Sequence, residues 1–279
     1  MTASSFPELL LPTGPEVRLS EDAGGYYCAH VFFLANQLAC QAAARPGLVE
    51  NGHGEPLVGF LHVPRDPACT FAAPVVPQVV RHAKTRVVVA AALRGYVEDA
   101  LAADVSGPVR LLVTGFGPFR DVLSNPTGDF VSREENLRTC LALAFGPSLV
   151  LDGAAVKVLE GERAKLSRLK ARAQVAGREV PLEVGFACLP VDDDALDPGR
   201  TDSLPGLLDR FRPHALLCLG VCRDSAFRVE VRPDTRGLAL DGARPAHDAD
   251  RAASVELKRS YALARAILRG GGALAPMAA

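Results

Sequence analysis

The fold is decided by one stretch, Leu112-Val113-Thr114-Gly115-Phe116-Gly117-Pro118-Phe119, which is followed six residues later by Asn125-Pro126. The apolar run at its start predicts a buried strand that ends near the first glycine. The glycines, the proline and the two phenylalanines predict a loop, and Pro126 suits the first turn of a helix. A strand that leads through a loop into a helix is typical of α/β proteins.

Outward from this stretch, short apolar runs alternate with amphipathic segments. The alternation predicts an α/β fold with a mixed, mostly parallel sheet and helices on both faces, in three α/β/α layers. The expected strands are residues 16–20, 57–63, 109–114, 154–159, 180–186, 215–219 and 227–231, with 154–159 paired to 180–186. The expected helices are residues 28–44, 78–103, 126–145, 203–211 and 252–268. Residues 160–176 fit either a helix or an exposed hairpin arm.

The chain length allows a substantial core. At 279 residues and 29.4 kDa the chain can form one large α/β domain. Neither an internal repeat nor a convincing domain boundary is visible. We therefore expect a single domain over residues 1–279, with loosely ordered tails at 1–14 and 270–279 and a linker at 104–108.

Composition argues against several classes of protein. Lys plus Arg (31) nearly balances Asp plus Glu (32), and no basic run interleaves with aromatics, which argues against a nucleic-acid partner. The most apolar stretch, residues 87–93, is far shorter than the ~20 residues of a membrane span. The seven cysteines are irregularly spaced and suggest no disulfide framework. With no signal-peptide pattern at residues 1–14, we expect a cytoplasmic protein without a membrane partner.

Cys28 is a candidate nucleophile. It follows the turn at Gly24-Gly25 and opens an expected helix. An ordinary thiol, with a pKa of ~8.5, is mostly protonated at neutral pH, and the partial positive charge of a helix N-terminus favours the reactive thiolate. The alternative is that Cys28 is a small apolar core residue.

His62 is a candidate general base. It lies in Gly59-Phe60-Leu61-His62-Val63-Pro64, at the C-terminal end of an expected strand, where α/β proteins place their sites. Its imidazole can take a thiol proton and later deliver it to a leaving amine. A structural histidine is the alternative, and His30 and His53 are competing bases.

Glu230, in the expected strand 227–231, is a candidate partner for that histidine. A buried carboxylate on imidazole Nδ1 fixes the tautomer and stabilises the imidazolium. The alternative is a solvent-exposed residue of an edge strand, in which case Asp224 or Asp234 is the candidate.

These segments together resemble the pyroglutamyl peptidase I (pyrrolidone-carboxylate peptidase) family of cysteine peptidases. Residues 112–126 resemble its substrate loop, residues 23–30 its nucleophile segment and residues 59–64 its histidine motif, whereas residues 232–250 match loosely. In the family the substrate loop opens the protein, but here it begins more than a hundred residues in. The chain therefore resembles a circularly permuted member, with residues 104–108 joining the family's usual termini.

The permutation makes a geometric prediction. Gly270 and Glu16 should lie near one another, within roughly 20 Å, a gap that a short loop spans at ~3.5 Å per residue.

The resemblance also implies a function, the removal of N-terminal pyroglutamate from peptides without a metal or organic cofactor. Cys28, His62 and Glu230 would form the catalytic triad. Phe116 and Phe119 would cover the pyroglutamyl ring, and Asn125 would hydrogen-bond its lactam. Because family members often form dimers or tetramers, a homo-oligomer is a further expectation.

Two rival functions stay open. Ala29, where the family usually has asparagine, and the altered surroundings of Glu230 favour a related thiol hydrolase acting on another amide or cyclic substrate. A non-catalytic scaffold or binding protein of the same fold is the second rival. A dinucleotide-binding turn at residues 115–117 is rejected because Arg120 occupies the third glycine position and Pro118 lacks a backbone donor. We expect no metal at Asp192-Asp193-Asp194, which reads as a solvated loop.

Overall fold

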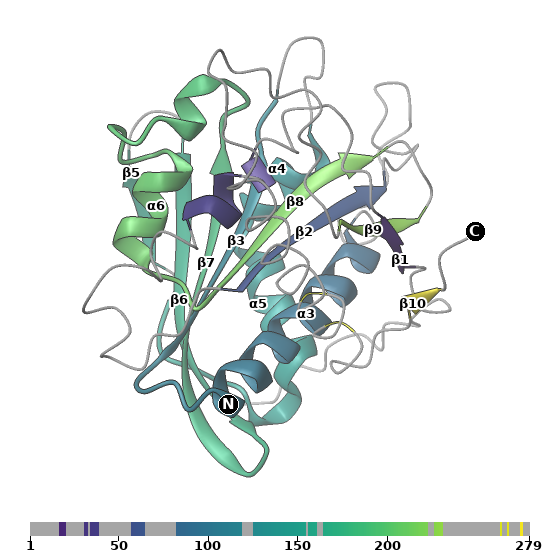
Figure 1. Ribbon diagram of the computed structural model, residues 1–279. Coiled ribbons are helices and arrows are strands. Elements are labelled where there is room, and N and C mark those ends of the chain that lie inside the picture. Colours follow the sequence, from purple (N-terminus) through teal and green to yellow (C-terminus); the bar gives the residue numbers. More distant parts are fainter. Residues whose placement is uncertain are drawn as a thin grey trace, which may run out of the picture.

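The computed structural model describes residues 17–20, 31–32, 34–38, 57–64, 82–118, 125–154, 156–160, 164–222, 226–230, 263, 267 and 274–275. These residues form a ten-stranded sheet with the order β10-β1-β9-β2-β8-β3-β7-β6-β4, and β5 pairs with β6 beside this path (Figure 1).

The bounds of the elements are as follows. The strands are β1 (Val17–Ser20), β2 (Leu57–Pro64), β3 (Val109–Phe116), β4 (Val150–Leu151), β5 (Val156–Glu160), β6 (Ala164–Val175), β7 (Arg178–Leu189), β8 (Ala215–Cys222), β9 (Phe227–Glu230) and β10 (Leu274–Ala275). The helices are α3 (Ala83–Ala102), α4 (Pro126–Val131), α5 (Glu134–Phe145) and α6 (Leu204–Phe211), with 3-10 turns η2 (Gly146–Ser148) and η3 (Asp193–Leu196). Residues 31–32 and 34–38 are also helical.

Parallel pairing holds the centre of the sheet together. β2 pairs with β8, β8 with β3, and β3 with β7, all in parallel, whereas β9 runs antiparallel to β2 and β6 antiparallel to β7. Residues 215–219 of β8 are buried on both faces, as a central parallel strand requires. The predicted α/β fold with a mixed, mostly parallel sheet is confirmed.

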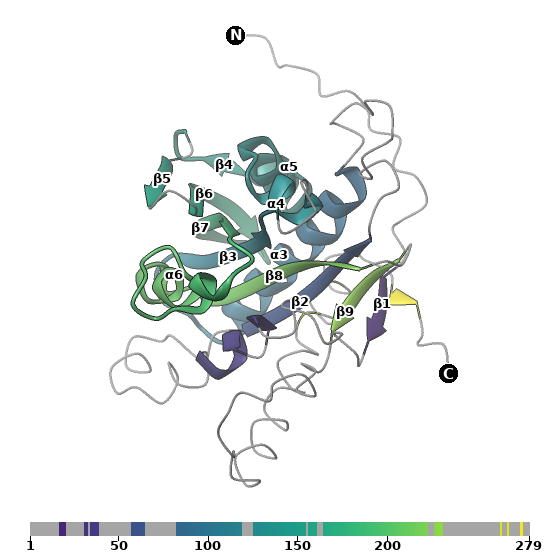
Figure 2. The ribbon, with the colours of Figure 1, turned by 90° about the horizontal axis from the view of Figure 1, so that it is seen from above.

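Side-chain alternation divides the core into two clusters. The first contains Leu61 and Val63 of β2 and joins them to α3 and α5. The second contains Phe60 of β2 and Phe116 of β3 and joins them to α6 and the helical residues 31–32. Because neighbouring residues of a strand point to opposite faces, each strand feeds both clusters. Figure 2 shows α5 and α6 on different sides of the strands.

Two elements differ from the sequence predictions. The helix expected over residues 126–145 is divided into α4 and α5, because Arg133 has an extended backbone and the side chain of Asn136 donates to the carbonyl of Phe130. The strand pair expected between 154–159 and 180–186 is wrong. β6 lies between β5 and β7 and pairs with both.

The undecided stretch 160–176 is mostly strand β6. Leu169, Ala171 and Ala173 are buried, while Lys170 between them is exposed. This period of two is the strand pattern. At the other side of the sheet, Leu274–Ala275, within the expected C-terminal tail, forms β10 beside β1.

Helix α3 is the longest helix in the described residues. Across that part of the chain, no helix combines the length and the apolar character needed to cross a membrane.

Candidate functional site

A buried histidine and a buried carboxylate meet between β2 and β9. Nδ1 of His62 lies 2.6 Å from Oε1 of Glu230, although the two residues are 168 positions apart in the sequence. His62 is 6% exposed and Glu230 is fully buried. A contact of this length between two buried side chains is a strong hydrogen bond.

The strand register explains why these two side chains meet. In the antiparallel pairing of β2 with β9, Phe60 lies opposite Glu230 and His62 opposite Arg228. Val229 faces the first cluster and Phe60 the second, so alternation turns His62 and Glu230 toward the second cluster. The two are therefore diagonal neighbours on one face of the sheet.

The ring of His62 is held on its other sides by Phe60 and Gly220. The Phe60 ring meets it edge-on at 4.9 Å between centroids. Gly220 of β8 lies opposite His62 in the register, and a Cβ there would come within 2.9 Å of His62 Cδ2 and 2.7 Å of Phe60 Cζ. The imidazole therefore fits in this position only because Gly220 has no side chain.

The hydrogen bond also determines what His62 can do. With Glu230 ionised, Nδ1 carries the proton and donates, so Nε2 is left as the basic nitrogen. A base whose second nitrogen is oriented by a buried carboxylate is the arrangement that activates thiol and hydroxyl nucleophiles. Within the described residues, the second oxygen of Glu230, Oε2, is buried without a hydrogen-bond partner.

A chain of aromatic rings leads from His62 to the helical residue Phe32. The ring of Phe32 lies 5.4 Å from that of Phe60, and Phe32 is helical and fully buried. Cys28, four residues before Phe32, lies outside the described residues, as do Phe119, the competing bases His30 and His53, and the alternative acids Asp224 and Asp234.

The predicted substrate residues Phe116 and Asn125 lie together at the end of β3. Phe116 is 2% exposed and packs in the second cluster, so it is a core residue. Asn125 is the N-cap of α4, where its Oδ1 accepts from the backbone N–H of Thr127 at 3.1 Å. Asn125 thus caps a helix, a structural role that was not predicted for it.

Close approach of two backbones holds α4 against β3. A Cβ on Gly115 would overlap the carbonyl of Thr127, and a Cβ on Gly128 would overlap the carbonyl of Phe116. Thr127 adds a hydrogen bond, because its hydroxyl accepts the backbone N–H of Phe116 at 3.1 Å. Thr127 and Gly128 were not among the predicted site residues. Their position directly after Asn125-Pro126, in the first turn of a helix, was the signal available.

The sheet divides next to these residues. β3 stays paired with β7 as far as Phe116, but its pairing with β8 ends at Thr114, opposite Cys218. β8 continues beside β2 to Cys222. The carboxyl edge of parallel strands is where α/β proteins bind ligands. His62 lies on one side of this division and Phe116 on the other, two strands apart, which is roughly 10 Å.

An open pocket of about 480 Å³ adjoins the end of β3. Its lining comes from the turn after β3, the end of α4 and the end of β7: Gly117, Pro118, Ser132 and residues 188–192. The volume is in the range of small-molecule sites, and the lining mixes polar and apolar groups.

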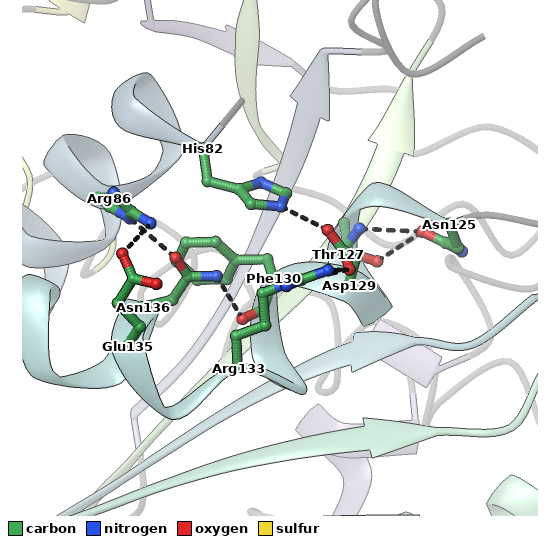
Figure 3. Close-up of polar contacts among 9 residues, drawn as sticks. All are labelled: His82, Arg86, Asn125, Thr127, Asp129, Phe130, Arg133, Glu135 and Asn136. Carbon is green, nitrogen blue, oxygen red and sulfur yellow. Dashed lines mark hydrogen bonds and ion pairs between the residues drawn. The ribbon is translucent and has the colours of Figure 1, made fainter. Parts of the chain in front are cut away.

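A polar network connects α4 to the neighbouring helices α3 and α5 (Figure 3). His82 Nε2 lies 2.9 Å from Asp129 Oδ2, and Arg133 donates to Asp129 Oδ1 at 2.7 Å. The hydrogen bond from His82, followed by that from Arg133, lowers the pKa of Asp129 to about 2. Buried Arg86 of α3 donates to Oδ1 of Asn136 on α5 at 2.8 Å. These hydrogen bonds connect α3, α4 and α5 and hold α4 in place.

No protein-family model matches the chain, and no significant match was found among curated proteins or among solved structures. The function is therefore inferred from the residues and their geometry.

Proposed function

We propose that the protein is a cysteine exopeptidase that removes N-terminal pyroglutamate from peptides. The observation that carries the proposal is the buried contact between His62 and Glu230 at 2.6 Å. A histidine buried for structural reasons alone has no need of a fully buried carboxylate, whose desolvation is costly. An imidazole that must become positively charged during a reaction does need one.

In the proposed reaction, Cys28 supplies the nucleophile. Its sulfur attacks the carbonyl carbon of the pyroglutamyl residue as Nε2 of His62 takes the thiol proton. The imidazolium, stabilised by Glu230, then protonates the leaving amine, and the C–N bond breaks to leave a thioester. Water, deprotonated by His62, hydrolyses the thioester and frees the thiol. Backbone amides near Cys28 and Gly220 would stabilise the oxyanion.

The reach of Cys28 is consistent with this role. Four residues of chain separate it from Phe32, which is at most ~14 Å. Phe32 contacts Phe60, and Phe60 contacts His62. Phe32 therefore lies on the same face of the sheet as the base, four residues along the chain from Cys28.

The substrate ring would lie at the carboxyl edge of the sheet, where β3 and β8 separate. Asn125 offers an amide to the lactam, and the apolar ends of β3 and β7 offer walls. Phe116 and Phe119 would cover the faces of the ring, and Phe116, which is 2% exposed, packs in the second cluster beside this edge.

The finer fold prediction, a three-layer and circularly permuted member of the family, belongs to this proposal. The two core clusters support the layers. The permutation is supported by β10, because Leu274 lies opposite Val17 in parallel register. Glu16 and Gly270 themselves lie outside the described residues. The join at 104–108 turns through positive φ at Asp104 and Gly107.

Turnover of a fluorogenic pyroglutamyl amide tests the function. We expect the wild-type protein to release the fluorophore and Cys28→Ala to release none above the rate without protein. Cys140→Ala is the matched control, because Cys140 is a fully buried thiol between α3 and α5 and its loss should leave turnover intact.

The two rivals give different results. A scaffold would bind the amide without turning it over. A thiol hydrolase for another substrate would neither bind nor turn over the amide. Iodoacetamide would nevertheless alkylate its Cys28 faster than a denatured control thiol. Either result contradicts the proposed peptidase.

A further inference from the structure

Two arginines lie in one row with His62 across three neighbouring strands. Arg228 of β9 is opposite His62 of β2 in the antiparallel register, and Arg18 of β1 is opposite Arg228 in the parallel register. Figure 2 shows β9 between β1 and β2. Because neighbouring strands are ~4.8 Å apart, the backbone of Arg18 lies two strands from that of His62, which is roughly 10 Å.

Both arginines project from the face of the sheet to which His62 turns. Val17 of β1 and Val229 of β9 pack in the first cluster. Because successive side chains of a strand alternate between the faces, Arg18 and Arg228 point to the other face. Arg18 is exposed and Arg228 is partly exposed, whereas His62 is 6% exposed. The row therefore leads from exposed positive charge to a nearly buried imidazole.

The arginines and the proposed ring site lie on opposite sides of His62. Gly220 of β8 is the neighbour of His62 on the ring side, and beyond it Phe116 ends β3. With the pyroglutamyl ring at the end of β3, the bond to be cleaved lies beside His62, whose Nε2 protonates the leaving amine. The leaving residue then extends over β9 and β1, which is the side that carries Arg228 and Arg18.

The charge at these two positions favours an anionic group on the leaving residue. Arginines directly opposite one another on neighbouring strands repel each other, and an anion between them offsets the repulsion. The five N–H donors of a guanidinium form a fork that matches a carboxylate. Both arginines have further interactions in the folded chain. Five donors allow one arginine to hold an internal partner and a ligand together.

We infer that Arg228 and Arg18 form an anion site that selects pyroglutamyl substrates with a carboxylate on the residue after the ring. The inference rests on the proposed function for the position of the cleaved bond, and it deepens that function by naming the substrate class. The carboxylate can come from two sources, the free C-terminus of a pyroglutamyl dipeptide or the side chain of a following aspartate or glutamate. Both place a full negative charge a few bonds from the leaving nitrogen.

Matched acid and amide substrates test the charge and identify its source. Pyroglutamyl-alanine and its C-terminal amide differ only in the terminal carboxylate, whereas pyroglutamyl-glutamate α-amide and pyroglutamyl-glutamine α-amide differ only in the side chain. Release of the second residue is followed by NMR. We expect kcat/KM of the wild-type protein to be about tenfold higher for the acid in at least one pair, mainly through a lower KM. Raising the salt concentration from about 20 mM to about 500 mM should reduce this preference.

Substitutions at the two positions connect the preference to the arginines. Arg228→Gln and Arg18→Gln should each lower kcat/KM for the acid at least about threefold more than for its amide. Arg228→Lys keeps the charge and should recover part of the preference. Arg178→Gln, at an exposed position at the start of β7, is the matched control and should keep the full preference. A purely structural role of Arg228 would lower both rates alike.

Binding in the Cys28→Ala background makes the test independent of turnover. Each acid and its amide are titrated by NMR, and we expect tighter binding of the acid and a smaller difference in Arg228→Gln. This binding pattern without any turnover by the wild-type protein would support the inference and remove the peptidase. If Arg228→Gln does not fold, Arg18→Gln, at an exposed position, decides.

The remaining outcomes overturn the inference. Turnover by the wild-type protein with equal kcat/KM for acid and amide in both pairs would leave the peptidase and assign the arginines to interactions within the chain only. An acid preference that survives in both Arg228→Gln and Arg18→Gln would place its cause elsewhere. Neither binding nor turnover of any of these compounds would remove the anion site and the peptidase together.

Discussion

At the scale of single residues, the chemistry depends on which nitrogen of His62 carries the proton. Glu230 accepts from Nδ1, so Nε2 is free to act as a base. The local sequence allowed a histidine and a glutamate to be proposed as partners. It could not fix their contact, because that contact comes from the register of β2 with β9, whose pairing is set by the whole sheet.

Glu230→Gln tests the orientation of the imidazole. The glutamine amide has nearly the same shape but can donate to Nδ1, which moves the proton to Nε2 and removes the base. We expect kcat/KM for pyroglutamyl amide to fall by roughly 10²–10⁴-fold while the protein stays folded. Glu179→Gln, at a side chain that is 59% exposed, is the matched control. Equal activity of Glu230→Gln and wild type would contradict the role of Glu230.

At the scale of elements, the sequence was most informative where its pattern was regular. Strand β3 was predicted from its apolar run, and helix α6, which Ser203 caps, lies within the expected helix 203–211. The break between α4 and α5 was missed because no glycine or proline marks it. It depends on the Asn136 side chain, which reaches the carbonyl of Phe130 only in the folded protein. Strand β6 could have been predicted from its alternation.

Gly128→Ala tests the contact of α4 with β3. Alanine normally stabilises a helix by up to ~1 kcal/mol relative to glycine. Here its Cβ would overlap the carbonyl of Phe116, and such overpacking costs ~1–3 kcal/mol. We therefore expect a net loss in the free energy of unfolding, measured in urea, and a loss of turnover as Asn125 shifts. Gly117→Ala, whose Cβ would meet Leu189 O at an ordinary 3.5 Å, should be nearly neutral.

The hydrogen bonds of Asp129 in α4 predict that the stability of the protein depends on pH. The pKa of Asp129 is lowered to about 2 by His82 and then Arg133, against ~3.9 for an unfolded aspartate. Below ~3.9 the unfolded chain binds the proton first, so the contribution of Asp129 to stability is complete above that pH and is lost as pH falls toward 2.

Asp129→Asn measures that contribution. We expect the variant to lose ~1–3 kcal/mol in the free energy of unfolding at pH 7, because charge-assisted bonds to His82 and Arg133 are lost. The difference from wild type should shrink as the pH is lowered from 4 toward 2.5. Asp152→Asn, which removes an exposed pair with Arg172, should cost at most ~1 kcal/mol. A difference between Asp129→Asn and wild type that is independent of pH would contradict this assignment.

At the scale of the whole molecule, the order of the elements along the chain differs from their order in the sheet. In the described residues, α3 follows β2 and leads to β3, yet β8 lies between these two strands in the sheet. β1 and β10, from opposite ends of the chain, are neighbours. A gene rearrangement that joins ends lying side by side preserves every contact of the fold.

Restoring the family's proposed order tests the permutation. The variant begins at Gly107, continues from residue 279 through a short glycine linker to residue 12, and ends at Ser106. We expect it to fold, with a urea midpoint near that of wild type, and to keep its turnover, because the cut falls in the turn between α3 and β3. An insoluble or inactive protein would argue against the permutation.

Trapping the covalent intermediate tests most directly whether His62 and Glu230 activate the thiol of Cys28. The protein is mixed with an activated pyroglutamyl ester and quenched in acid, and its intact mass and peptide map are measured. We predict one added pyroglutamyl group, on Cys28, formed much more slowly in His62→Ala and Glu230→Gln. No adduct, an adduct on another cysteine, or equal rates in all three proteins would contradict a thiol activated by His62 and Glu230.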